Sequence, residues 1–119
     1  MHAILRGRCI LIVEDQMLVA LDIAHSFSAA GATVLRAATL QEGWPFAEHP
    51  QLSAAILDFG LSDGDSGALC ARLTERGIPF IVYTGYDEVP EVCRAGVLVR
   101  KPALPETLLK TVAQLLGQK

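Results

Sequence analysis

The sequence lacks the features that mark several classes of protein. Its three cysteines are widely spaced without a CxxC pair and its three histidines show no ligand-like spacing, so neither a disulfide framework nor a zinc site is indicated. No apolar run approaches membrane-spanning length, and the apolar segment near Met1 is too short for a signal peptide. We therefore expect a cytoplasmic protein that does not bind membranes.

The sequence also lacks a strong excess of positive or negative charge. The chain has 13 acidic and 10 basic residues, a formal net charge of -3, and no long run of either sign. This composition gives no electrostatic footprint for nucleic acid, so we expect no nucleic-acid partner. A hydrophobic content of 51% in 119 residues is enough for one ordinary core. We expect a single domain over residues 1–119, without an effector domain.

Apolar runs typical of buried strands alternate with stretches of helical periodicity. The strand-like runs are Cys9 to Val13, Thr33 to Arg36, Ala54 to Asp58, Ile78 to Tyr83 and Val97 to Arg100. The helical patterns are a stretch of about fifteen residues from Gln16, then Ala38 to about His49, Ala68 to Arg76, and Pro105 to Leu116. This alternation predicts an α/β fold of the doubly wound, flavodoxin-like kind, with a five-stranded parallel sheet in the order 2-1-3-4-5.

The crossover between the last two strands is short. Residues 85–96 must leave one strand, cross a face of the sheet and enter the next, which is near the minimum for such a connection. Gly85 and Gly96 bound the segment and Pro90 lies inside it. We therefore predict at most a short, mobile helix around Glu91 to Ala95 instead of a full fourth helix.

Polar side chains follow four of the five predicted strands. Glu14 and Asp15 come directly after the first strand, Asp58 ends the third, Thr84 follows the fourth and Lys101 follows the fifth. Taken separately, each residue has an ordinary explanation, such as an acid that caps a loop or a lysine on the surface. Because parallel strands place their carboxyl ends at one edge of the sheet, we expect all five side chains to converge there.

Carboxylates packed this closely repel one another unless a cation neutralises them. Oxygen ligands with room for water favour Mg²⁺ or Mn²⁺ over zinc. A hydroxyl from Thr84 and an ammonium from Lys101 would then hold the remaining oxygens of a phosphoryl group bound at Asp58. The pattern predicts a phosphoryl-transfer site, where positioning and charge neutralisation do most of the work.

These residues resemble those of the response-regulator receiver domain, the CheY-like family, over nearly the whole chain. Glu14 and Asp15 stand at the family's acidic pair, Asp58 at its phosphoacceptor, Thr84 at its switch hydroxyl, and Lys101 with Pro102 at its conserved lysine. The resemblance also implies that the backbone carbonyl of Gly60 is a metal ligand. It implies transfer from the phosphohistidine of a sensor histidine kinase to Asp58, then slow hydrolysis, with no other enzymatic activity.

The stretch Pro79-Phe80-Ile81-Val82-Tyr83-Thr84-Gly85-Tyr86 is similar to the PFxFATGY signature of a stand-alone receiver subgroup. That subgroup is linked to kinases of the HWE or related type in alphaproteobacteria. The resemblance thus implies a kinase of this type and an unidentified downstream partner protein supplied in trans.

This chain departs from the family pattern at several positions. Ser62 replaces the usual proline after the phosphoacceptor, and Leu98 stands where most receivers have an aromatic switch residue. Tyr83 replaces the subgroup's usual alanine, and Ala103 replaces the phenylalanine that often follows Lys-Pro. We predict that Tyr86 takes over the switch by moving with Thr84; the alternative is that Tyr86 covers the sheet edge.

Two other functions use parts of this pattern. A phosphohydrolase of the haloacid-dehalogenase type also forms an aspartyl phosphate with Mg²⁺, but it needs a second carboxylate where this chain has Gly60. A receiver-like module that binds partners without phosphorylation would not need the intact set of Asp15, Asp58, Thr84 and Lys101.

Overall fold

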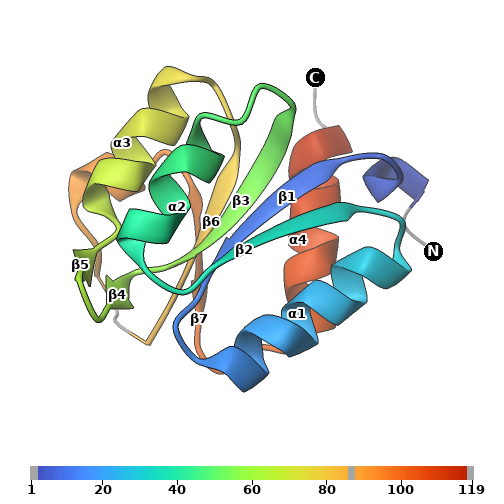
Figure 1. Cartoon of the computed structure of the whole chain (residues 1–119), viewed down its shortest axis with the longest axis horizontal. Coiled ribbons are helices and arrows are strands. Elements are labelled where there is room, and N and C mark those ends of the chain that lie inside the picture. Colours follow the sequence, from blue (N-terminus) through green and yellow to red (C-terminus); the bar gives the residue numbers. More distant parts are fainter. Residues whose placement is uncertain (1–2, 86–87, 118–119) are drawn as a thin grey trace.

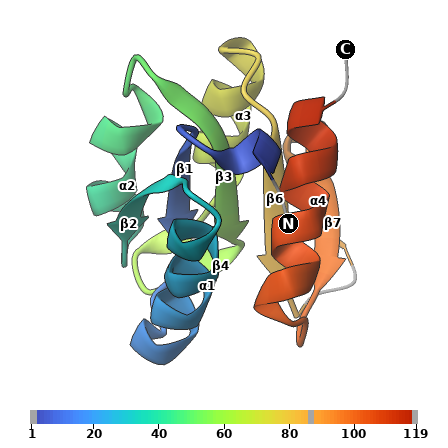
Figure 2. The same ribbon diagram turned by 90° about the vertical axis from the view of Figure 1, so that its right-hand side faces the viewer.

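The protein is built around one parallel sheet, and its computed structural model describes residues 3–85 and 88–117. The five strands run in the order β2-β1-β3-β6-β7, and every neighbouring pair is parallel. Their arrows point the same way in Figure 2. Their bounds are Cys9–Val13 for β1, Thr33–Ala37 for β2, Leu52–Asp58 for β3, Phe80–Thr84 for β6 and Val97–Arg100 for β7. The predicted fold class and strand order, 2-1-3-4-5 among these five strands, are confirmed.

Four helices cover the two faces of the sheet, as Figures 1 and 2 show. Helices α1 (Met17–Ala29) and α4 (Pro105–Gly117) pack on one face, together with a short 3-10 helix, η1 (Ala3–Leu5). Helices α2 (Leu40–Ala47) and α3 (Gly67–Glu75) pack on the other. None of the helices in the described part of the chain has both the length and the apolar character that a membrane span requires.

Helices on both faces explain why β1 is apolar throughout. In β1, Leu11 and Val13 face α2 and α3, whereas Ile10 and Ile12 face α1 and α4, and all four are fully buried. Successive strand residues point to opposite faces, so a strand covered on both sides has no position left for a polar residue. A polar residue is accommodated only where the strand ends.

Among its described residues, 85 and 88–96, the crossover between β6 and β7 contains one short helical segment, the 3-10 helix η2 (Glu91–Cys93). The prediction of at most a short helix there is confirmed. Gly96 is needed beside it, because a Cβ at this position would lie 2.4 Å from the Phe80 ring. Tyr86, the predicted switch residue, lies outside the described residues.

A small antiparallel hairpin, β4 (Gly60–Leu61) with β5 (Gly64–Asp65), follows β3. The second helix ends at Ala47, two residues before the expected end near His49, and the Arg76 guanidinium donates to the carbonyls of Ala47 at 2.7 Å and His49 at 3.0 Å.

Candidate functional site

Three carboxylates meet at the carboxyl edge of the sheet. Oxygen atoms of Glu14, Asp15 and Asp58 all lie within 4.8 Å of one another. Glu14 and Asp58 are buried, whereas Asp15 is exposed. Glu14 and Asp15 directly follow β1, Asp58 ends β3, and these two strands are neighbours in the sheet. The structure therefore brings together the three acids that the sequence predicted to converge.

Glu14 has the most unusual environment of the three acids. One of its carboxylate oxygens accepts a hydrogen bond from the backbone N–H of Gln16 at 3.0 Å. Burial raises the pKa of the Glu14 carboxyl above its usual value, and the nearby Asp58 charge raises it further, while the Gln16 bond and Lys101 lower it; burial prevails. The charged form of Glu14 is thus disfavoured by its own burial and by the neighbouring Asp58 charge.

Lys101 supplies positive charge directly to this edge. Its Nζ lies 3.2 Å from Asp58 Oδ2 and 3.3 Å from Glu14 Oε1. Burial disfavours its charged form, but the attraction of Asp58 and Glu14 outweighs burial and raises the pKa of the Lys101 ammonium. Lys101 therefore bridges two acids. The sequence reasoning assigned it to phosphoryl oxygens and did not anticipate this pairing.

Thr84 and Gly60 lie at the same edge. Thr84 ends β6, directly after Tyr83, which is the register partner of Asp58, and its side chain is almost fully buried. The Thr84 carbonyl accepts the Lys101 backbone N–H at 2.8 Å, so the two residues are tied through the main chain. Gly60 is exposed in β4, two residues beyond Asp58.

Ser66 is a residue of this site that sequence reasoning missed. Its hydroxyl donates to the backbone carbonyl of Asp58, its N–H donates to the Phe59 carbonyl at 2.9 Å, and its side chain is fully buried. A serine just before a helix usually caps that helix. Here it instead holds the backbone of Asp58 and Phe59, the two residues before Gly60, and only its position before α3 hinted at a structural role.

Tyr83 was noticed in the sequence only as a departure from the family pattern. Its ring lies below the Lys101 ammonium, with Nζ 5.1 Å from the ring centroid. Its hydroxyl exchanges hydrogen bonds with the backbone of Ala103, accepting from the N–H and donating to the carbonyl, both at 3.2 Å. No sequence motif points to these contacts, because they join residues far apart in the chain.

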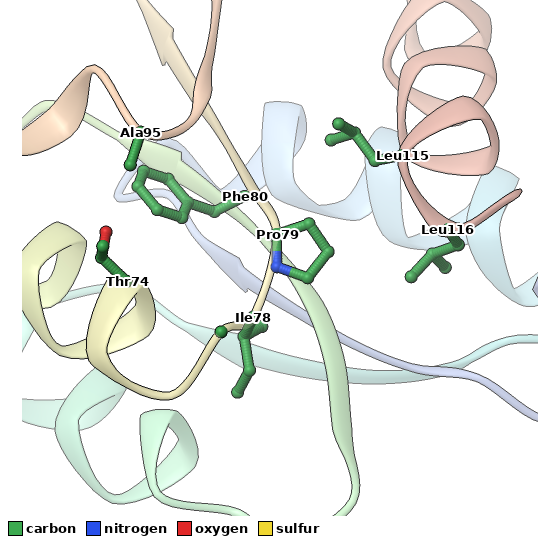
Figure 3. A pocket seen from close by; sticks show the side chains of 8 residues that line it. Thr74, Ile78, Pro79, Phe80, Ala95, Leu115 and Leu116 are labelled. Carbon is green, nitrogen blue, oxygen red and sulfur yellow. The ribbon is translucent and has the colours of Figure 1, made fainter. Parts of the chain in front are cut away.

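The hollows on the surface separate into two kinds. A small pocket of 190 Å³ opens beside the acids and is lined in part by Glu14, Asp15 and Arg36. A larger hollow of 570 Å³, shown in Figure 3, lies at the opposite edge, where β6 begins at Phe80 and Leu115 and Leu116 approach the end of α4. No carboxylate or ammonium is among the described residues that line this larger hollow.

The structure is similar to solved receiver domains over nearly its whole length. A response regulator receiver domain protein (CheY-like) from Methanospirillum hungatei JF-1 shares 28% sequence identity with a TM-score of 0.81, over 92% of this chain and 94% of that chain. The non-phosphorylated HemR receiver domain from Leptospira biflexa shares 20% identity with a TM-score of 0.83, over 95% and 97%. The chemotaxis response regulator CheY4 of Vibrio cholerae shares 24% identity with a TM-score of 0.76, over 92% and 98%.

No protein-family model matches this sequence, and neither does any curated protein. The structural similarities place the chain in the CheY-like fold, and its neighbours in that fold are response-regulator receiver domains. The narrower resemblance to the PFxFATGY subgroup stays a prediction.

Proposed function

We propose that this chain is the receiver domain of a response regulator, which accepts a phosphoryl group from a sensor histidine kinase on Asp58. The observation that carries this proposal is the convergence of Glu14, Asp15 and Asp58 with the Lys101 ammonium at the carboxyl edge of a parallel sheet. Ligands bind at that edge in open α/β sheets. The similarity to solved receiver domains supports the same function.

The donor set fits a hard divalent cation. All three carboxylates offer oxygen, two of them are buried, and one ammonium against three acids leaves excess negative charge among the described residues. Mg²⁺ or Mn²⁺ prefers oxygen ligands and retains water. Glu14, Asp15 and Asp58 would hold the ion, with the Gly60 carbonyl as a further ligand. When bound, it would neutralise charge on the phosphoryl oxygens.

In the proposed reaction a carboxylate oxygen of Asp58 attacks the phosphorus atom of a phosphohistidine. The P–N bond breaks, its electron pair passes to the imidazole nitrogen, and the ring takes up a proton. Asp58 becomes an acyl phosphate. Lys101 already pairs with Asp58 Oδ2, so its ammonium is placed to pair with a phosphoryl oxygen, and the Thr84 hydroxyl would donate to another.

Hydrolysis ends the phosphorylated state. A water oxygen adds to phosphorus, the bond between phosphorus and the Asp58 oxygen breaks, and inorganic phosphate leaves while the carboxylate is restored. A haloacid-dehalogenase-type enzyme would speed this step with a second carboxylate at the position of Gly60. Without an acid there, we propose that dephosphorylation is slow and that the phosphorylated form persists as a signal.

Exposed apolar side chains beside the acids suit contact with a protein phosphodonor. Met17 and Leu18 begin α1 just after Asp15, with 72% and 82% of their surfaces exposed, and Leu104, at 72%, follows Lys101 by three residues. Helices α1 and α4 contact each other, so these side chains flank the site. We propose that they meet the phosphohistidine-bearing surface of a sensor histidine kinase of the HWE type.

Leu18→Ser tests this contact. The variant should take phosphate from phosphoramidate at the wild-type rate, because Leu18 is outside the reacting group, but receive it more slowly from autophosphorylated HWE-type kinase domains. Equal slowing with both donors would instead indicate damage to the site itself.

A pull-down that compares the wild type with Asp58→Ala tests the downstream partner, since identical sets of bound proteins would contradict signalling controlled by phosphorylation.

A further inference from the structure

Tyr83 lies on the same side of the sheet as the acidic site. It is paired in register with Asp58 on β3 and with Val99 on β7. Its side chain packs on the face covered by α1 and α4 and is 6% exposed. Val99 packs on this face too, and alternate strand residues share a face, so Lys101, two residues farther on, leaves β7 toward Tyr83.

Two parts of the Tyr83 side chain contact the segment that carries Lys101. The ring lies under the ammonium, 5.1 Å from Nζ to the centroid, while the same Nζ pairs with Asp58 and Glu14. The hydroxyl both donates to and accepts from the backbone of Ala103. A phenolic hydroxyl has one donor and spare acceptor capacity, so one group satisfies both backbone atoms.

These contacts restrain a side chain that is otherwise flexible. Lysine has a long stem with many rotamers, and fixing it opposes folding or binding by lost entropy. The ring face attracts the ammonium, and the bonds to Ala103 hold the backbone two residues beyond it. Together they place the ammonium between two carboxylates before any phosphoryl group arrives.

The placement of this aromatic ring differs from that in the family that the sequence resembles. There, phenylalanine often follows the Lys-Pro pair and the position of Tyr83 is usually alanine in the subgroup; here the loop has Ala103 and strand β6 has Tyr83. Strand β6 therefore supplies the aromatic ring beneath Lys101, and position 103 in the following loop is an alanine.

We propose that Tyr83 is the positioning residue for Lys101, whose ammonium it holds at the phosphoacceptor through its ring and through its hydroxyl bonds to Ala103. This inference rests on the proposed role of Asp58. It predicts that loss of Tyr83 slows phosphorylation because the ammonium leaves its place, while the three carboxylates and their affinity for metal change little.

The test compares Tyr83→Leu, which removes ring and hydroxyl, with Tyr83→Phe, which keeps the ring. Ile81→Val is the matched control, since Ile81 is a buried residue on the same strand and face as Tyr83. Proton NMR of the Lys101 side chain measures its contact with the Tyr83 ring directly, because the resonances of methylene protons over an aromatic face are shifted upfield. Amide hydrogen exchange at Ala103 reports the hydroxyl bonds.

We expect Tyr83→Leu to lose the upfield shift and to be labelled by phosphoramidate about threefold to tenfold more slowly, the range that a cation–π contact supports. Tyr83→Phe should keep an upfield shift but exchange the Ala103 amide faster. In a Lys101→Ala background, Tyr83→Leu should cause no further slowing, because its effect passes through the lysine. Ile81→Val should match the wild type in all three readouts.

The inference is overturned if the Lys101 resonances and labelling rate are unchanged in both tyrosine variants, or if the slowing persists in the Lys101→Ala background. If Tyr83→Leu does not fold, Tyr83→Phe decides, because wild-type exchange at Ala103 together with a wild-type labelling rate would contradict the proposal. If the wild type takes up no phosphoryl group, the proposed function fails; the NMR and exchange readouts then still decide whether Tyr83 positions Lys101.

Discussion

Replacing Asp58 by asparagine is expected to stabilise the metal-free protein. The Asp58 carboxylate attracts the Lys101 ammonium 3.2 Å away, by about 5 kcal/mol at an effective dielectric constant of about 20. It also repels two carboxylates within 4.8 Å, by about 3 kcal/mol each on the same scale. Because Asp15 is exposed and screened, these opposing terms nearly cancel.

The desolvation of Asp58 then decides whether the substitution raises or lowers the free energy of unfolding. Its carboxylate is 7% exposed, and a buried charge carries a penalty that a neutral amide of the same shape largely avoids. Asparagine also keeps an oxygen that accepts from Lys101. We therefore expect Asp58→Asn to raise the free energy of unfolding by about 1 to 2 kcal/mol without metal.

Urea unfolding in EDTA measures this difference, with Asp22→Asn as the matched control because Asp22 is exposed on α1. Saturating Mg²⁺ should reverse the order, since the wild type gains binding energy that the variant lacks. An Asp58→Asn variant that is less stable than the wild type in EDTA would refute the reasoning, because it would mean that attraction to Lys101 outweighs repulsion and desolvation.

Three further predictions follow from the same contacts. Asp15→Ala should weaken Mg²⁺ binding at least about tenfold in calorimetry but leave stability unchanged in EDTA, because Asp15 is exposed; unchanged affinity would contradict its role as a ligand. In EDTA the stability that the protonated Glu14 contributes should be complete below its ordinary pKa of 4.5 and should be lost as the pH rises through the raised pKa of the folded protein. The wild type should therefore lose stability relative to Glu14→Gln over that pH range. Curves of unfolding free energy against pH that run parallel for the two proteins would contradict the raised pKa. Gly96→Ala should lower the free energy of unfolding by about 2 to 4 kcal/mol through the clash with Phe80, whereas Gly85→Ala, which has open space, should change it little in the same urea titration.

The fold was largely predictable because its signals are local. Strands buried on both faces must be apolar throughout, so runs such as Cys9–Val13 are visible in the sequence, and helices between them require a parallel sheet. The convergence of Asp15 and Asp58 followed from the same topology, since parallel strands end at one edge.

Features that depend on distant contacts were not predictable. Asp63 accepts hydrogen bonds from the backbone N–H groups of Leu40 and Gln41, at 2.9 and 3.1 Å, and so caps α2 from a loop more than 20 residues away. The bonds between Tyr83 and Ala103 likewise join residues 20 positions apart. Sequence patterns specify which face a residue occupies, but the partner of a polar group depends on the packed arrangement.

The most direct test of the proposed function is to locate a phosphoryl group on the protein. We would incubate the wild type and Asp58→Asn with Mg²⁺ and phosphoramidate, and measure intact and peptide masses before the acyl phosphate hydrolyses. The proposed function predicts one phosphoryl group per wild-type chain, located on Asp58, dependent on Mg²⁺ and absent from Asp58→Asn. Labelling that survives in Asp58→Asn, that maps to another residue, or that never occurs in the wild type would contradict it.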